Sequence, residues 1–183
     1  YKKDHAFDNA AEFAALTHGH PSGYLSAGAL AYIIASIIEG KDLLTAVTDT
    51  IKKLELYKGH EECTSKLNNA LELFESEFSD VETLKQIGEG WVGEEALAIS
   101  VYCALKYQRS FKEALISAVN HNGDSDSTGA ITGNILGAYL GINSIPVEWV
   151  NKIELNDVLM KIVDDLFIGY QDTEEWWKQY PGY

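Results

Sequence analysis

At 183 residues, with 46% hydrophobic and 23% charged residues, the chain has a globular composition and enough length for a sizeable core. Its formal net charge of -14 excludes the basic footprint of a nucleic-acid-binding protein, and we expect no nucleic acid and no membrane as partner. The two cysteines, Cys63 and Cys103, are too few for a disulfide scaffold, which favours a reducing, cytoplasmic location.

Hydrophobic periodicity predicts helices along nearly the whole chain. Apolar and small residues recur at three-to-four spacing in segments 10–17, 25–37, 43–56 and 63–74, with a polar break at 18–23. A glycine-rich bend at 88–93 precedes predicted helices at 94–107 and 111–119, and a polar loop at 121–123 leads into a helix that reaches about residue 140. Pro146 starts a new element, and 155–167 form a last long helix. Because strand-like alternation, linkers and repeats are missing from this pattern, it predicts one all-α domain over residues 1–183.

The acidic motif, residues 124–128, is the part of the sequence that carries most chemistry. It reads Asp-Ser-Asp-Ser-Thr, and its carboxylate and hydroxyl oxygens are the ligands that Mg²⁺ or Ca²⁺ prefers. A cation between Asp124 and Asp126 would offset the repulsion of two neighbouring carboxylates. Helix capping is the alternative, since Asp and Ser are good N-caps and a carboxylate is favoured at the positive end of a helix. Spacing alone leaves both interpretations open.

Four glycines follow the acidic motif at every fourth position: Gly129, Gly133, Gly137 and Gly141. At that spacing they share one helix face. Each glycine in a helix costs about 1 kcal/mol relative to alanine. Their recurrence therefore predicts a helix whose backbone packs closely against another helix.

Two other interpretations of the acidic motif fail on neighbouring residues. An EF-hand loop that starts at Asp124 needs a bidentate Glu at its twelfth position, where this chain has Ile135. A phosphotransferase of the haloacid-dehalogenase type needs its nucleophilic Asp at the end of a buried apolar strand. Here Asn-His-Asn-Gly at 120–123 follows a helical segment instead.

Residues 121–138 closely resemble the C-terminal signature of the ADP-ribosylglycohydrolase family. Two further segments resemble that family in the same order along the chain: a Thr-His loop at 16–24 and a glycine-tryptophan segment at 88–98. The resemblance implies a helical bundle of the ADP-ribosylglycohydrolase type. It also implies hydrolysis of the glycosidic bond that joins ADP-ribose to a modified protein or a small ADP-ribosyl substrate.

The family holds two divalent cations, Mg²⁺ or Mn²⁺, between an N-terminal Thr-Asp-Asp motif and a C-terminal Asp-x-Asp-Ser/Thr motif. By this resemblance the metal ligands in this chain are Asp124, Asp126 and Ser127, and Thr128 would serve the helix start. The resemblance also implies a set of substrate-binding residues: His18, Gly90, Trp91, Asn122 and Gly123. A core position remains the alternative for Trp91 and a structural role the alternative for His18. Glu94, Glu95 and Asp164–Asp165 are interpreted as helix-start or surface charges.

The Thr-Asp-Asp part of the family pattern does not occur in this sequence. We therefore expect a C-terminal part of a larger family domain, truncated at its N-terminus, with the catalytic residues in the missing part. Such a chain alone is expected to bind Mg²⁺ weakly, to lack appreciable hydrolase activity, and to self-associate or pair with the missing N-terminal segment. The alternative function is a non-catalytic relative that binds ADP-ribose or serves as a structural, crystallin-like protein.

Overall fold

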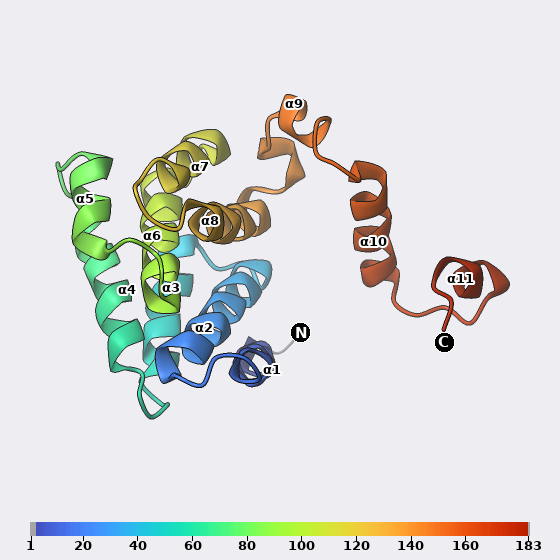
Figure 1. Cartoon of the computed structure of the whole chain (residues 1–183), viewed down its shortest axis with the longest axis horizontal. Helices are drawn as coiled ribbons and strands as arrows, with labels where there is room; N and C mark the ends of the chain where they lie inside the picture. Colours follow the sequence, from blue (N-terminus) through green and yellow to red (C-terminus); the bar gives the residue numbers. More distant parts are fainter. Residues whose placement is uncertain (1–2, 183) are drawn as a thin grey trace. The chain divides into compact units, whose positions relative to one another are not determined.

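The computed structural model describes residues 3–182, and within that range it contains helices and no strand. Figure 1 shows these helices in chain order. The elements are α1 (Lys3–Ala15), α2 (Pro21–Ile38), α3 (Leu43–Leu54), α4 (Glu61–Leu73), α5 (Asp80–Ile87), α6 (Gly93–Lys106), α7 (Phe111–Val119), α8 (Ser125–Leu140), the short 3-10 helix η1 (Ile142–Ser144), α9 (Val147–Val150), α10 (Asn156–Ile168) and α11 (Glu174–Gln179). The all-α prediction is confirmed.

Contacts within the chain divide it into two compact units. The first unit, Tyr1–Ile145, contains α1 to α8 and η1, and the second unit, Pro146–Tyr183, contains α9 to α11. That both belong to one domain over 1–183 stays a prediction.

The core of the first unit is built around α6 and α2. Every residue of α6 from Ala96 to Leu105 is buried, and this helix contacts α2, α4, α7 and α8. Helix α2 contacts α1, α3, α6 and α8, and it is long and apolar enough to cross a membrane by length and composition. Over half of α2, 56%, is buried within the fold, so its apolar composition matches a place in the core.

Helix α5 was not predicted, and a capping box defines its start. The Ser79 hydroxyl accepts a hydrogen bond from the Glu82 amide, and the Glu82 carboxylate accepts one from the Ser79 amide. Its first residue, Asp80, ties this helix to its neighbours by accepting hydrogen bonds from four side chains: Tyr102 (2.9 Å), Lys106 (2.7 Å), Tyr107 (2.8 Å) and Ser117 (2.7 Å). These donors belong to α6 and α7 and to the turn between them, so one carboxylate fastens three helices.

The glycine stripe on α8 packs closely at only one of its four positions. A Cβ at Gly129 would lie 2.7 Å from Val119 Cγ1, which confirms a close approach of α8 to α7 there. At Gly133 the nearest atoms would be 4.0 Å away, and at Gly137 nothing lies within 4 Å. Gly141 ends the helix with φ +76°. The prediction of a stripe pressed against another helix along its whole length was therefore wrong beyond Gly129.

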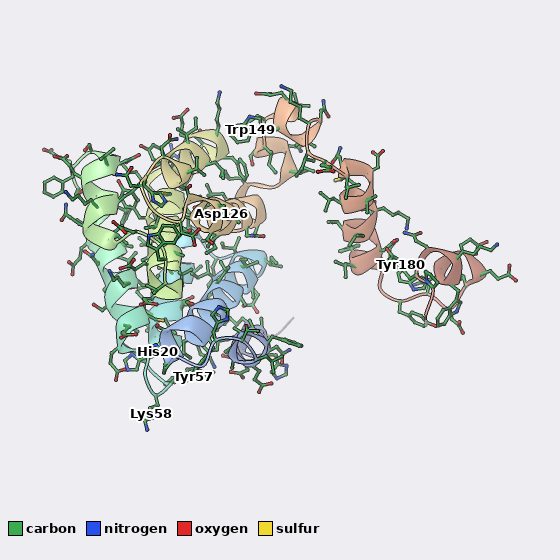
Figure 2. The ribbon with its side chains drawn as sticks, in the orientation of Figure 1. His20, Tyr57, Lys58, Asp126, Trp149 and Tyr180 are labelled. Atoms are coloured by element: carbon green, nitrogen blue, oxygen red, sulfur yellow. The ribbon has the colours of Figure 1, made fainter. Side chains whose placement is uncertain are left out.

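The second unit has one buried residue among those the structure describes, Asp165 on α10. Its carboxylate accepts hydrogen bonds from Gln179 Nε2 at 3.0 Å and from the hydroxyl of Tyr180 at 2.7 Å, and it pairs with Lys161. Figure 2 labels Tyr180 beside this helix. The interpretation of Asp165 as a surface charge was wrong, since this carboxylate joins α11 to α10.

Candidate functional site

The acidic motif lies at the N-terminal end of α8, where Asp124 occupies the position before the first helical residue. The Asp124 side chain makes no capping hydrogen bond of normal geometry, but the Ser127 amide helps to lower its pKa, so the capping and metal interpretations both stay open. The pKa of the Asp124 carboxyl is lowered from its ordinary value, first by a hydrogen bond with the Asp126 carboxyl and then by one with the Ser127 hydroxyl. The three predicted metal ligands thus lie within four consecutive residues at the start of α8, where the Asp126 and Ser127 side chains affect the Asp124 carboxyl.

The exposure of these side chains leaves room for a ligand. Asp126 is exposed on α8, where Figure 2 labels it, and Asp124 and Ser127 are half-buried. Two carboxylates and a hydroxyl are suitable oxygen donors for Mg²⁺, which commonly uses one or two carboxylates and keeps several waters. Residues 3–182 contain no group of three or more His, Cys, Asp or Glu side chains that could hold a metal ion. The donor type therefore fits a hard cation, and the donor number allows only a partial site.

Thr128, next to these three residues, has a structural role. Its hydroxyl is fully buried and donates to the carbonyl oxygen of Ala118 at 2.7 Å. The ring of His121 accepts from the Gly123 amide at Nδ1 (3.1 Å), so its proton is on Nε2, which lies 2.9 Å from the Thr128 oxygen. This chain of hydrogen bonds fixes loop 121–124 onto the start of α8.

The glycine-rich loop 88–91 contacts the acidic motif directly. The amide of Asp124 donates to the carbonyl oxygen of Glu89 at 2.8 Å. A Cβ at Gly123 would lie 1.7 Å from that same oxygen, so only glycine allows this approach. Gly90, at φ +81°, is buried against Thr128, whose Cγ2 would lie 3.1 Å from a Cβ there. Two predicted substrate-binding residues, Gly90 and Gly123, therefore have packing reasons to be glycine.

Two cavities lie near loop 88–91, and the first is lined by residues of both the Thr-His loop and the glycine-tryptophan segment. It encloses about 570 Å³ and is lined by His18, Gly19, His20, Ser22, Gly23, Glu62, Trp91, Val92, Gly93 and Glu94. The Trp91 side chain is 66% exposed, which excludes the core interpretation, and its indole N–H donates to the Glu89 carboxylate at 3.2 Å. His18 is exposed too, with Nδ1 2.8 Å from the Thr17 hydroxyl. The cavity therefore brings two of the predicted binding residues together.

Two acidic residues of this cavity were not predicted to face a ligand. Glu62 comes from α4 and pairs with His20 at 3.5 Å, while the Oε2 atom of Glu94 is buried without a hydrogen-bond partner among the described residues. His20, labelled in Figure 2, also caps α2 by accepting from the Ser22 amide. No spacing in the sequence indicates that Glu62 joins this cavity, because the contact is made between separate helices.

The second cavity contains two further predicted binding residues, Asn122 and Gly123, while the fifth, Gly90, lines neither cavity. This second cavity encloses about 420 Å³ between α5 and loop 120–123, and its lining is Val81, Leu84, Lys85, Gly88, Glu89, Asn120, His121, Asn122 and Gly123. The structure therefore does not place Asn122 and Gly123 in one cavity with His18 and Trp91. Their role in binding stays a prediction.

Comparison with known proteins identifies a family over most of the chain. The family model described as ADP-ribosylglycohydrolase matches residues 1–175. ADP-ribosyl-[dinitrogen reductase] glycohydrolase of Rhodospirillum rubrum is 44% identical over 46 residues, which cover 25% of this chain and 16% of that protein. ADP-ribosylarginine hydrolase Tri1 of Pseudomonas putida is 34% identical over 66 residues, covering 36% of this chain and 18% of that protein.

A longer alignment is made with ADP-ribosylhydrolase ARH3 of Homo sapiens. The two are 25% identical over 187 residues, which cover 88% of this chain and 48% of the human protein. The chain thus spans less than half the length of each of these three relatives.

Proposed function

The chain belongs to the ADP-ribosylglycohydrolase family, and from that premise we propose that it takes part in hydrolysing the glycosidic bond of ADP-ribose. The observation that carries this proposal is the position of Asp124, Asp126 and Ser127 at the N-terminal end of α8, beside loop 88–91. The bacterial relatives act, by their names, on ADP-ribosylated dinitrogen reductase or on ADP-ribosylarginine. The proposed substrate is accordingly an ADP-ribosylated protein or a small ADP-ribosyl compound.

In this proposal Asp124, Asp126 and Ser127 hold a divalent cation, Mg²⁺ or Mn²⁺, through their oxygen atoms. When bound, such a cation would supply Lewis-acid polarisation and orientation of substrate oxygens. The complete family site holds two ions, and three ligands are too few for both. We propose that the remaining ligands, including a Thr-Asp-Asp motif, come from residues outside this chain of 183.

The chain's own side chains would bind and orient the substrate. Trp91 presents an exposed indole face at the 570 Å³ cavity, suited to stacking on the adenine or a ribose. His18, on the opposite loop of the same cavity, offers a ring nitrogen for a hydrogen bond to a ribose hydroxyl or a phosphate oxygen. Thr128 and His121 keep the acidic motif in place and touch no substrate in this proposal, while Asn122 and Gly123 would meet the substrate at the second cavity.

Release of ADP-ribose from ADP-ribosylarginine tests the proposal. We expect no appreciable turnover by the 183-residue chain alone, and turnover when it is joined to a family N-terminal segment with an intact Thr-Asp-Asp motif. Asp126→Asn in the joined protein should abolish that turnover, because it removes one of the two carboxylates of the motif. Asp157→Asn is the matched control, since Asp157 is an exposed carboxylate in the first turn of α10.

Two outcomes would change the assignment. Turnover by the chain alone would contradict the proposed division of the metal site. Metal-independent binding of ADP-ribose without turnover in the joined protein would favour the alternative function, a non-catalytic ADP-ribose-binding or structural relative.

A further inference from the structure

We propose that Glu95 is a positioning residue for the acidic motif, acting through loop 88–90. The inference rests on the proposed function, because it gives Glu95 a purpose only if Asp124 and its neighbours hold a cation. Glu95 lies in the first turn of α6, and its hydrogen bonds go to loop 88–90 and to Lys66 rather than to the three proposed ligands. Its influence passes through the backbone of Glu89.

The Glu95 carboxylate fastens the loop with both of its oxygens. Oε2 accepts hydrogen bonds from the backbone amides of Glu89 at 3.0 Å and of Gly90 at 3.2 Å. Oε1 lies 3.0 Å from the ammonium of Lys66 on α4, and this lysine also donates to the carbonyl oxygen of Ile87. The end of α5 and the loop after it are therefore tied to two core helices.

Partial burial strengthens this attachment. The Glu95 side chain is 22% exposed and that of Lys66 31%. Burial acts to raise the pKa of Glu95, but Lys66 and the two amides outweigh it and hold the pKa below its ordinary value. Glu95 is thus ionised at neutral pH, and hydrogen bonds to an ionised acceptor are stronger than those between neutral groups.

The Glu95 carboxylate fits closely against the backbone of loop 88–90 at Gly88. A Cβ at Gly88, where φ is +151°, would lie 2.3 Å from Cδ of Glu95. The carboxylate therefore fills the space that any side chain at position 88 would need. Only glycine at position 88 thus leaves room for the carboxylate that binds the loop amides.

The loop in turn fixes the start of α8. The Glu89 carbonyl oxygen that accepts from the Asp124 amide (2.8 Å) belongs to the same residue whose amide is held by Glu95. Gly123 and Gly90 close the remaining space between the loop and α8, so neither side can shift without the other. Loss of the Glu95 carboxylate would therefore loosen the backbone at Asp124 while leaving the helical core intact.

Backbone hydrogen exchange at Asp124, measured by NMR on the 183-residue chain, tests the inference. In Glu95→Ala we expect this amide to exchange about tenfold faster or more, the effect of losing about one hydrogen bond of ordinary strength. Glu95→Gln keeps an oxygen that can accept from both amides, so its exchange should stay nearer the wild type. Glu113→Ala is the control, because Glu113 is an exposed carboxylate at the same place in α7.

Mn²⁺ affinity, measured on the same variants, separates this inference from the proposed function. We expect weaker Mn²⁺ binding in Glu95→Ala and a partial rescue in Glu95→Gln. Wild-type exchange at Asp124 in Glu95→Ala would overturn the inference, whatever the metal result. Faster exchange at Asp124 in Glu95→Ala, together with no Mn²⁺ binding by the wild type, would support the positioning role of Glu95 and overturn the metal proposal. If Glu95→Ala does not fold, Lys66→Met and Glu95→Gln provide the same comparison.

Discussion

Ser127 and Thr128 are neighbouring hydroxyl residues with separate tasks. Thr128 is fully buried and gives its proton to the carbonyl oxygen of Ala118, while Ser127 is half-buried beside Asp124. The buried hydroxyl of Thr128 and the more accessible hydroxyl of Ser127, which we propose as a cation ligand, are thus adjacent in sequence. This division of roles is testable by single substitutions.

Replacing Thr128 by valine should destabilise the chain by about 1–3 kcal/mol, because the Ala118 carbonyl and the His121 ring lose a buried partner. Ser127→Ala should change the free energy of unfolding by less than about 0.5 kcal/mol, because its half-buried side chain is small, and should weaken Mn²⁺ binding. Urea unfolding and a Mn²⁺ titration of both variants measure these effects. Equal destabilisation by both substitutions would contradict the assignment.

Asp80 is the carboxylate on which acid stability should depend most. Burial acts to raise its pKa, but hydrogen bonds from Lys106, Ser117 and two tyrosines outweigh burial and lower the pKa to about 2. A carboxyl with a lowered pKa stabilises the fold above its unfolded pKa, near 3.8, and loses that contribution as the pH falls toward 2.

Asp80→Asn should therefore lower the free energy of unfolding at pH 7 by about 2 kcal/mol. It should also flatten the loss of stability between about pH 4 and pH 2. Chemical unfolding at several pH values measures both effects. If the variant lost as much stability as the wild type at acid pH, other carboxylates would account for the acid sensitivity of the fold. Asp157→Asn serves as the control, since that carboxylate is exposed.

At the scale of elements, helices with a continuous apolar period were predictable and the short polar one was not. The predicted segments 94–107 and 111–119 correspond closely to α6 and α7. Helix α5 has only eight residues, and its apolar side chains are too few to establish a period. Its signals were local: Ser79 and Glu82 form a capping box, and Gly88 ends the helix.

Spacing within α8 predicted a shared face for its glycines, but not what lies opposite that face. Only the fold shows that Val119 meets Gly129 and that nothing lies near Gly137. The candidate site divides in the same way. The acidic motif is contiguous in sequence and could be predicted, whereas the attachment of loop 88–90 to Glu95 and Lys66 joins residues from separate helices.

Gly129→Ala and Gly137→Ala form a matched pair of predictions on one helix. Alanine at 137 meets no atom within 4 Å and should stabilise the chain by up to about 1 kcal/mol, the helix preference for alanine over glycine. The Cβ of an alanine at 129 would lie 2.7 Å from the stiff side chain of Val119, so Gly129→Ala should destabilise the chain. Thermal unfolding compares the two, and stabilisation by both would show that α8 does not pack closely at Gly129.

At the scale of the whole molecule, the chain is a family member that spans less than half the length of the Rhodospirillum, Pseudomonas and human relatives. Its first unit presents the three proposed oxygen ligands at the start of α8, which two neighbouring loops hold. A chain of this length would supply donors of the right chemical type for a divalent cation, but too few of them to hold two ions. The acidic motif is thus proposed to form one side of a metal site.

Direct titration with Mn²⁺ tests that claim. We expect the wild-type chain to bind Mn²⁺ weakly, and Asp126→Asn to reduce the affinity by about tenfold or more, as loss of an ionised ligand should. Asp157→Asn should bind as the wild type does. Equal Mn²⁺ affinity of the wild type and Asp126→Asn, or no binding by either, would contradict the claim.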